Sequence, residues 1–169
     1  MFKDSRNEKA EAYQILAQFF LQPPDEESLD AIRQDFSLDS RETLDEITKD
    51  FYGLFPYPHG RLQPRESLCV PLTGAGYADV GDAYKGAGLA IDESYEVAPD
   101  HLSLELLFMS HLIMNSETEM EQNFLEQHLL NWVPYYCDEV IKQSKTLFYR
   151  EIAEIVKDFL VSEHDEYTR

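Results

Sequence analysis

The 169-residue chain has a length that suits one domain, and its 43% hydrophobic content, with ten Phe and ten Tyr, is enough for one sizeable core. Thirty-three acidic and fourteen basic residues give a formal net charge of -19, which repels phosphate backbones and anionic lipid head groups. Nucleic acid and membrane surfaces are therefore poor partners, and the charge serves either a well-hydrated surface or the attraction of a basic segment.

The first part of the chain carries apolar side chains at helical spacing. They are Ala12, Ile15, Leu16 and Phe19 in one stripe, and Leu44, Ile47, Phe51, Leu54 and Phe55 in another. This spacing predicts helices over about 5–21, 26–35 and 40–55. Asp25 is a start signal for the second helix, and Asp39 with Glu42 can form a capping box before the third.

The middle of the chain departs from this pattern. Pro56, Pro58, Gly60 and Pro64 interrupt it, and Gly74, Gly76, Gly81, Gly86 and Gly88 then thin it. We expect a long connector from about 56 to 90 with short helical pieces, including one over about 76–87. The sequence shows neither an alternating strand pattern of useful length nor an internal repeat.

The last part of the chain returns to helical spacing. One face of its final helix is lined by Phe148, Ile152, Ile155, Val156 and Phe159. We expect helices over about 100–115, 117–132, 134–144 and 146–162, and Ser116 with Glu119 can form a second capping box. The sequence therefore predicts an all-α, single-domain helical bundle over residues 1–169, with a long Pro/Gly-containing connector in the middle.

The most pointed local feature is the run Pro99-Asp100-His101 at the expected start of a helix. Asp100 is a good N-cap residue, and Pro99 disfavours helical backbone at the residue before it. His101 and Glu105 are spaced i, i+4 and share a helix face, where they can bind a cationic or hydrogen-bonding ligand. The structural and the ligand-binding interpretations are compatible.

Other signs of chemistry are weak. His59, His111 and His128 show no recognised metal-site spacing to His101, and neither GxSxG nor a catalytic-cysteine signature is present. A flexible connector explains the Gly74–Gly76 pair better than a dinucleotide site does, and helical spacing predicts that Trp132 is buried. We expect no metal, no cofactor and no catalytic residue; a metal-dependent hydrolase that uses His101 and Glu105 is the enzyme alternative.

Compartment follows from the cysteines and the N-terminus. Cys69 and Cys137 stand far apart without a CxxC motif, which favours a reducing compartment. The first residues lack an apolar signal segment, and Glu105, Ser110 and His111 interrupt the most hydrophobic stretch. A soluble, cytoplasmic protein is the expectation.

Four segments in this order resemble the TorD/DmsD family, which has NarJ-type relatives. They are LQPRESL at 62–68, APDHLSLELLFM at 98–109, FLEQHLLNWVP at 124–134 and Phe148-Tyr149 at the start of the last helix. The resemblance spans essentially the whole chain, and its most specific part is the PDHxxxEL-like run at 99–106. Leu68-Cys69 is a departure, because many relatives carry an aromatic residue just after the serine of the first segment.

The resemblance implies a cytoplasmic maturation chaperone, without enzymatic turnover, for a molybdopterin-containing oxidoreductase. Such a chaperone binds the twin-arginine leader peptide and the apo form of the catalytic subunit, which aids cofactor insertion and delays export. Carried over by position, the leader-binding surface contains Asp100 and His101, with Glu105 and Met109 behind them, and Glu66 and Ser67 from the first segment.

Two alternatives stay open at this stage. One is a helical adaptor with the same fold and an unrelated partner. The other concerns assembly: a monomer is the expected state, and exchange of helices between two chains across the connector would give a domain-swapped dimer.

Overall fold

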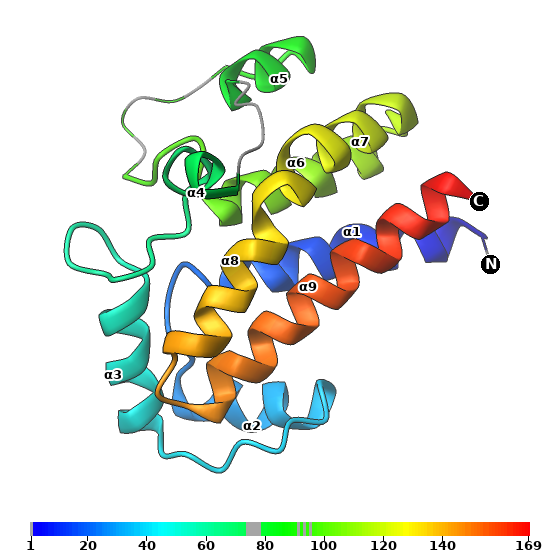
Figure 1. Ribbon diagram of the computed structural model, residues 1–169. Coiled ribbons are helices and arrows are strands. Elements are labelled where there is room, and N and C mark those ends of the chain that lie inside the picture. Colours follow the sequence, from blue (N-terminus) through cyan, green and yellow to red (C-terminus); the bar gives the residue numbers. More distant parts are fainter. Residues whose placement is uncertain (1, 74–78, 91, 93, 95) are drawn as a thin grey trace.

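The computed structural model describes residues 2–73, 79–90, 92, 94 and 96–169, and over these residues the chain is all-α (Figure 1), as predicted. Its elements are α1 (Phe2–Gln18), α2 (Glu26–Asp35), α3 (Leu44–Leu54), α4 (Glu66–Thr73), α5 (Val80–Gly86), α6 (Leu102–Met114), α7 (Thr118–Phe124), the π-helical segment η1 (Leu125–Leu129), α8 (Leu130–Gln143) and α9 (Leu147–Thr168). None of these helices combines the length and the apolar character needed to cross a membrane.

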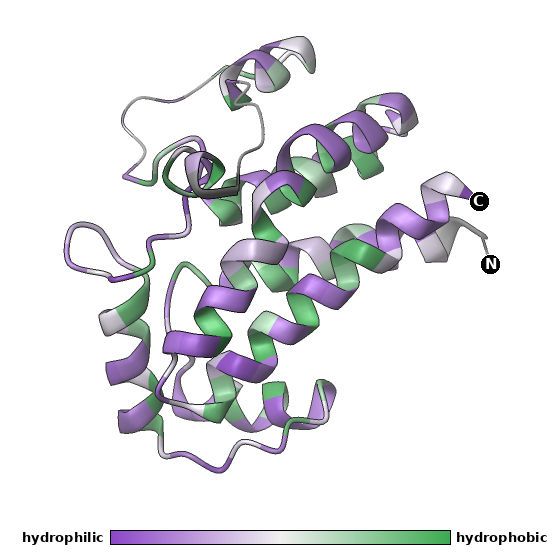
Figure 2. Cartoon of the chain, viewed as in Figure 1, coloured by the Kyte–Doolittle hydropathy of each residue, from purple (hydrophilic) through white to green (hydrophobic). Residues whose placement is uncertain are grey.

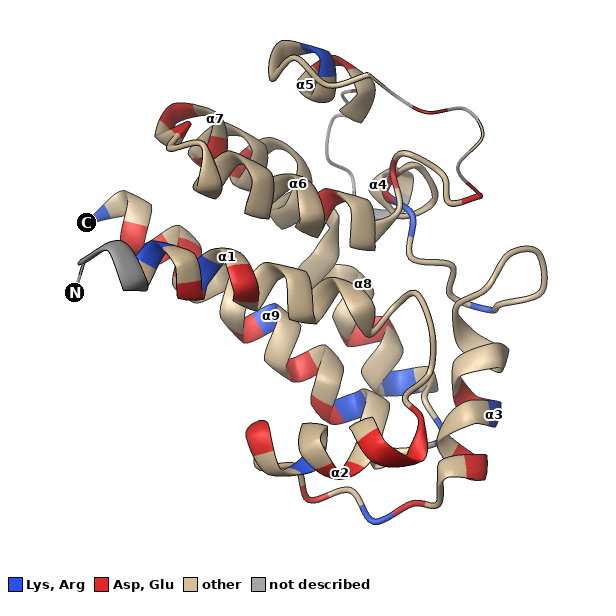
Figure 3. Cartoon of the chain, turned by 180° about the vertical axis from the view of Figure 1, so that it is seen from behind, with Lys and Arg blue, Asp and Glu red and all other residues tan. Residues whose placement is uncertain are grey.

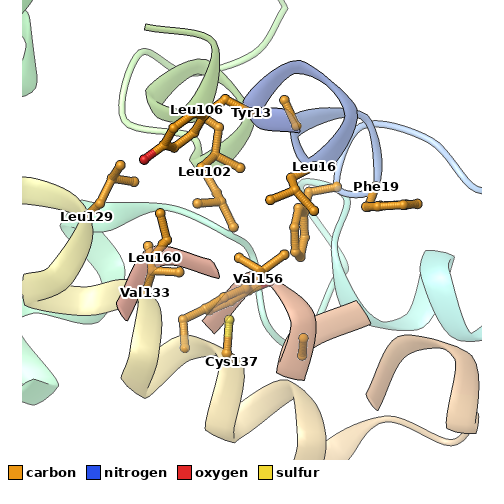
Figure 4. Packing of buried hydrophobic residues seen from close by; sticks show 14 of the residues in the cluster. Tyr13, Leu16, Phe19, Leu102, Leu106, Leu129, Val133, Cys137, Val156 and Leu160 are labelled. Atoms are coloured by element: carbon orange, nitrogen blue, oxygen red, sulfur yellow. The ribbon is translucent and has the colours of Figure 1, made fainter. Parts of the chain in front are cut away.

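Helices α1, α6, α8 and α9 form the body of the molecule. Their inward faces meet in one buried cluster, in which Leu16, Leu106, Val133 and Val156 come from the four different helices (Figure 4). Polar and apolar residues alternate along α8 and α9 (Figure 2), as expected for helices with one buried face. This packing removes a large apolar area from water and is the main stabilising term of the fold.

The start of α1 lies beside the end of α9. The ring of Tyr13 packs edge-on against Phe159, with ring centroids 4.9 Å apart, and its hydroxyl donates to Glu163 Oε1 at 3.2 Å. Lys9 pairs with the carboxylates of Glu163 and Glu166. The two helices therefore run antiparallel, and the predicted amphipathic character of the final helix is confirmed.

Helix α3 is attached to the body through aromatic rings. Phe55, at its C-terminal end, contacts Phe20 and Tyr149 edge-on, with centroid distances of 5.4 and 5.3 Å. Phe51 packs on the same ring, one helical turn earlier. The end of α1, the end of α3 and the start of α9 thus share one aromatic cluster.

The capping contacts confirm one prediction and correct another. Asp25 forms a capping box with Ser28 at the start of α2, as expected, but α3 begins at Leu44 and is capped by Thr43 with Glu46. Glu42 therefore does not cap α3. It accepts instead from the amides of Leu147 and Phe148 at the start of α9, at 2.6 and 3.1 Å.

The second predicted capping box and the predicted break near residue 133 are wrong. Ser116 has a φ of 55°, and the residue before α7, Glu117, makes no side-chain cap. The chain stays helical from α7 through η1 and α8, with Pro134 inside α8. Trp132 is fully buried, which confirms its predicted place in the core.

The connector contains two short helices, α4 and α5, which lie apart from α3 and close to α6 (Figure 1). Helix α4 was not expected as an element, and it packs through the buried side chain of Val70. Helix α5 covers the second half of the predicted 76–87 helix; residues 74–78 lie outside the described part of the chain.

Candidate functional site

Two segments far apart in the sequence meet at the start of α6. The amide of Glu66 donates to the carbonyl oxygen of Asp100 at 3.0 Å, and the amide of Leu102 donates to the carbonyl oxygen of Pro64 at 2.8 Å. Between these two bonds, residues 65 and 101 pair as an isolated antiparallel β-bridge. The beginnings of α4 and α6 are therefore fixed side by side.

Asp100 caps α4 rather than its own helix. Its Oδ2 accepts from the amide of Ser67 at 3.0 Å and from the hydroxyl of Ser67 at 2.5 Å, while Oδ1 accepts from Nε of Arg65 at 3.0 Å. Burial alone would raise the pKa of Asp100, but the Ser67 bonds and the Arg65 guanidinium outweigh it, so the pKa lies below its usual range. Asp100 is a buried carboxylate that ties α4 to α6.

His101 is the residue that caps α6. Its Nδ1 accepts from the amide of Ser103 at 3.1 Å, which places the proton of the neutral ring on Nε2. Burial, aided by the Arg65 charge and opposed by Asp100, lowers the pKa of His101 to about 4. At neutral pH the imidazole is therefore uncharged and offers one N–H donor.

Glu105 points into the core and does not pair with His101 as a ligand site. Its Oε1 accepts from Nε1 of Trp132 at 3.1 Å, and its Oε2 has no hydrogen-bond partner among the described residues. Burial, followed by the charge of Glu66, raises the pKa of Glu105 well above its usual range. Burial therefore favours the protonated, uncharged form of this side chain.

A second buried polar contact joins α4 to η1. Nδ1 of His128 lies 2.9 and 3.1 Å from the two carboxylate oxygens of Glu66, and both side chains are almost completely buried. The His128 ring also stacks on Phe124, with ring centroids 4.7 Å apart. Glu66 and His128 therefore fix the position of α4 against the body.

The six side chains expected at a binding surface occupy different environments. Asp100, Glu66, Glu105 and Met109 are buried, and Ser67 is half-buried with its hydroxyl directed at Asp100. His101 is the member of this set that lines a cleft. The other five can influence a ligand only by positioning the backbone and side chains around it.

The cleft lies between the ends of α1 and α3, the segment before α4 and the segment before α6. It has a volume of about 970 Å³. Its apolar wall is formed by Phe20, Leu21, Phe51, Phe55, Pro56, Tyr57, Pro64, Val97, Ala98 and Pro99. Its polar residues are Gln63, Arg65, Asp92, Glu96 and His101.

Two features of the cleft suit a ligand that is both cationic and apolar. The Arg65 guanidinium is paired with Asp100, so its charge is largely balanced, whereas Asp92 and Glu96 are exposed carboxylates. The Tyr57 ring is 82% exposed at the rim. A flexible chain can therefore find acidic, apolar and N–H donor groups within one hollow.

Sequence reasoning missed most of the cleft wall. The helical spacing of the run Phe51–Phe55 predicts core residues, which is confirmed for Phe51 and Phe55, but it does not show that both also line a cleft, and Pro56 and Pro64 indicate only breaks in a helix. A signal for the cleft does exist in the sequence, because Tyr57 is a large aromatic residue in a Pro-rich turn, where no core is available to bury it.

A smaller apolar hollow of about 300 Å³ lies beside the cleft, between α5 and α6. It is lined by residues such as Tyr84, Leu107 and Phe108, and it shares Asp92, Val97 and Pro99 with the cleft. The hydroxyl of Tyr84 donates to the carbonyl oxygen of Pro99 at 2.7 Å. The 97–99 segment is therefore a wall between the two hollows.

Taken together, these helices define an all-α protein with an open cleft where a short helix is fixed beside the start of a long one. A family model described as nitrate reductase delta subunit matches residues 11–138, which is most of the chain. The chain belongs to this family, and the relationship to TorD/DmsD proteins and their NarJ-type relatives is confirmed.

Several curated relatives are chaperones. The chain is 24% identical over 153 residues to the chaperone protein TorD of Colwellia psychrerythraea (73% of this chain, 65% of the relative). It is 31% identical over 134 residues to TorD of Vibrio atlanticus (69% and 60%) and 26% identical over 157 residues to TorD of Photobacterium profundum (82% and 73%). The chain thus covers less than two thirds of the length of the first two.

Proposed function

We propose that this chain is a cytoplasmic maturation chaperone that binds the leader peptide and the apo form of a molybdopterin-containing oxidoreductase subunit. Membership in the nitrate reductase delta subunit family and similarity to proteins named TorD chaperones support the class. The observation that carries the leader-binding role is the cleft, which combines an apolar wall with the carboxylates of Asp92 and Glu96. A binding role without chemical turnover fits the chaperone names of the relatives.

A twin-arginine leader has the chemistry that this cleft accommodates. Two guanidinium groups seek carboxylates, and the apolar part of the leader seeks aromatic surface such as Phe20 and Tyr57. His101 supplies an uncharged donor for a backbone carbonyl of the peptide. Because Asp100 neutralises Arg65, the one guanidinium already in the wall repels the leader only weakly.

The six residues first expected to contact the leader take two roles in this proposal. His101 lines the cleft and contacts the peptide directly. Asp100 and Ser67 hold the start of α4, while Glu66, Glu105 and Met109 keep the helices behind the cleft in place. The leader has to be ordered on binding, which costs roughly 2–5 kcal/mol, so micromolar or somewhat tighter affinity with reversible release is expected.

Calorimetric titration with a client leader tests the proposal. We expect the leader to bind, and replacement of its two arginines by alanine to weaken binding at least tenfold. The chain variant Asp92→Lys/Glu96→Lys should weaken binding by a similar factor. The matched control is Glu117→Lys/Glu119→Lys, which makes the same change in net charge at exposed positions around the start of α7 and should bind like the wild type.

Two outcomes would contradict leader recognition in the cleft. One is equal affinity for the wild-type leader and its alanine variant. The other is an equal loss in the cleft variant and in the control variant, since that would reflect net charge alone. Co-purification of the chain with an unrelated partner, and without an oxidoreductase subunit, would favour the helical-adaptor alternative.

A further inference from the structure

A second hollowed surface lies along α1, away from the groups that face the cleft. One part, of about 240 Å³, has a floor that includes Ile15, Phe36 and Phe159. The other part, of about 440 Å³, continues from Ile15 toward Pro24 and Ile32. Because Ile15 borders both parts, they form one groove between α1, α2 and α9, which we call the α1–α2 groove.

The floor of this groove is apolar and reaches the solvent. The side chain of Ile15 is 49% exposed, although its neighbours on α1, Leu16 and Ala17, are buried. Phe36, Ile32, Ile155 and Phe159 are only partly buried. Helix α2 is held at one edge of the groove by the edge-on contact of Phe36 with Phe19, with ring centroids 5.5 Å apart.

The ends of the groove are acidic. Glu8 and Glu11 line one end, and Asp25 lines the other. Figure 3 shows acidic residues along α1 and α2, with a few basic residues between them. Hydrogen bonds from Ser28 lower the pKa of Asp25, so this carboxylate stays ionised over the whole physiological range. Negative charge therefore lies at both ends of the apolar floor of the α1–α2 groove.

We propose that the α1–α2 groove docks a basic amphipathic helix of the client polypeptide, outside its leader. From Glu8 to Gln18 the groove runs along about ten residues of α1, or about 15 Å, which matches roughly three turns of a docked helix. Apolar side chains of that helix cover Ile15 and Phe36, and lysine or arginine near its ends meets Glu8, Glu11 and Asp25. A second copy of this chain is the wrong occupant, because each copy carries a net charge of -19.

Fluorescence polarisation with a synthetic helical peptide tests this proposal. The probe is a 14-residue peptide with leucine on one face and lysine on the other, and its partner probe carries glutamate in place of lysine. We expect the lysine peptide to bind and the glutamate peptide to bind at least tenfold more weakly. Ile15→Asp in the chain should weaken the lysine peptide at least tenfold, whereas Met114→Asp, at an equally open apolar position on α6 (59% exposed), should change it less than twofold.

Charge requires its own control, because any basic peptide is attracted to an acidic protein. Glu8→Lys/Glu11→Lys should weaken the lysine peptide at least tenfold, and Glu117→Lys/Glu119→Lys, with the same net charge, should change it less than twofold. Equal losses in the two charge variants, or equal affinity in Ile15→Asp and Met114→Asp, would overturn the proposal. So would a wild-type dimer in sedimentation that Ile15→Asp dissociates.

Docking in the α1–α2 groove and leader binding in the cleft can be tested separately. The docked helix is a client helix only if the function proposed above holds, but Ile15→Asp should in either case leave the affinity for the leader peptide within twofold of wild type. A parallel loss of leader binding in Ile15→Asp would mean that the α1–α2 groove is not a distinct surface.

Discussion

Two buried aspartates show how differently the body and the connector are held. At the edge of the body, Asp50 on α3 accepts hydrogen bonds from Ser144, Lys145 and Thr146, which lie between α8 and α9, and the side chains of Ser144 and Thr146 are buried. At the connector, Asp100, which precedes α6, accepts from Ser67 and Arg65, and the Arg65 side chain is 33% exposed. Each carboxylate fixes a remote helix, but the side chains that bond Asp50 are buried, whereas the Arg65 side chain that bonds Asp100 reaches water.

This difference separates stability from binding. The body is held by apolar contacts and fully buried caps, so damage there unfolds the molecule. Helix α4 packs through Val70, and its N-terminus is fixed by the polar contacts of Asp100 and of the Glu66–His128 pair, so loss of these contacts should alter the neighbouring cleft wall first. Substitutions in the two regions should therefore give different ratios of stability loss to affinity loss.

The largest effect is expected for Phe148→Ala. Phe148 is fully buried at the start of α9, and removing its ring leaves a cavity in the body, so we expect the free energy of unfolding to fall by about 3–5 kcal/mol. Urea denaturation measures this loss. Tyr57→Ala is the control, because an 82% exposed ring should change stability by less than about 0.5 kcal/mol. A loss below about 1 kcal/mol for Phe148→Ala would contradict the assignment of Phe148 to the body.

The two aspartates provide the direct comparison. Asp50→Ala should lower the free energy of unfolding by about 3 kcal/mol, since it leaves buried donors without an acceptor, while Asp100→Ala should lower it by about 1 kcal/mol. Leader affinity, measured under conditions where both variants are folded, should fall at least tenfold in Asp100→Ala and less than twofold in Asp50→Ala. The reverse order of affinities would show that α4 does not shape the binding cleft.

The pH dependence of stability tests the buried state of Glu105 in the body. Because burial raises the pKa of Glu105 in the folded state, the unfolded chain releases this proton at lower pH than the folded protein does. Above the unfolded-state pKa of about 4.3, the contribution of Glu105 to the free energy of unfolding therefore falls as pH rises toward the folded-state pKa. Glu105→Gln mimics the neutral acid and removes that dependence.

Urea denaturation at pH 5 and pH 8 measures the Glu105 effect. The stability of Glu105→Gln relative to the wild type should be higher at pH 8 than at pH 5, because only the wild type carries the pH-dependent cost. A relative stability that does not change with pH would mean that Glu105 is ionised in the folded protein.

The smallest effect is expected for His101→Ser. Serine keeps a good N-cap for α6, so the free energy of unfolding should change by less than about 0.5 kcal/mol. The variant loses the Nε2 donor in the cleft, and one hydrogen bond is worth about 1 kcal/mol, or about fivefold in leader affinity. Calorimetric titration measures the affinity of the folded variant for the leader. An unchanged affinity would mean that His101 does not contact the leader.

The sequence predicted those features of the fold that depend on local residue patterns. Helix α2 has its predicted bounds and Asp25 caps it as expected, and in the predicted apolar stripe of α9 Phe148, Ile152 and Val156 are buried. Helix α4 was missed because Pro64 and the glycines from Gly74 onward favour an irregular connector, although α4 forms between them and contains Pro71. The break expected near residue 133 is absent, since η1 precedes Pro134 and a wider turn of this kind commonly accompanies irregularities inside helices.

The site was less predictable because its key contacts cross long stretches of chain. Asp100 and Glu42 were both assigned to the nearest helix, whereas each caps a helix that only the tertiary fold brings close. The pattern at 99–106 lies where α4 and α6 meet, but no pattern shows that Glu105 turns toward Trp132 and away from solvent. Periodicity shows which face of a helix is buried, but the residues that pack against this face depend on the rest of the fold.

Hydrogen exchange with and without the leader peptide tests the central claim most directly. At a leader concentration of 100 times Kd, binding stabilises the bound state by about 2.7 kcal/mol, so amides that exchange by opening of the cleft should slow by about 100-fold. We predict this protection at the amides of Glu66, Ser67 and Leu102, which join α4 to α6, and no comparable change within α8 and α9. Unchanged exchange at these three amides, with protection in another part of the molecule, would contradict the account.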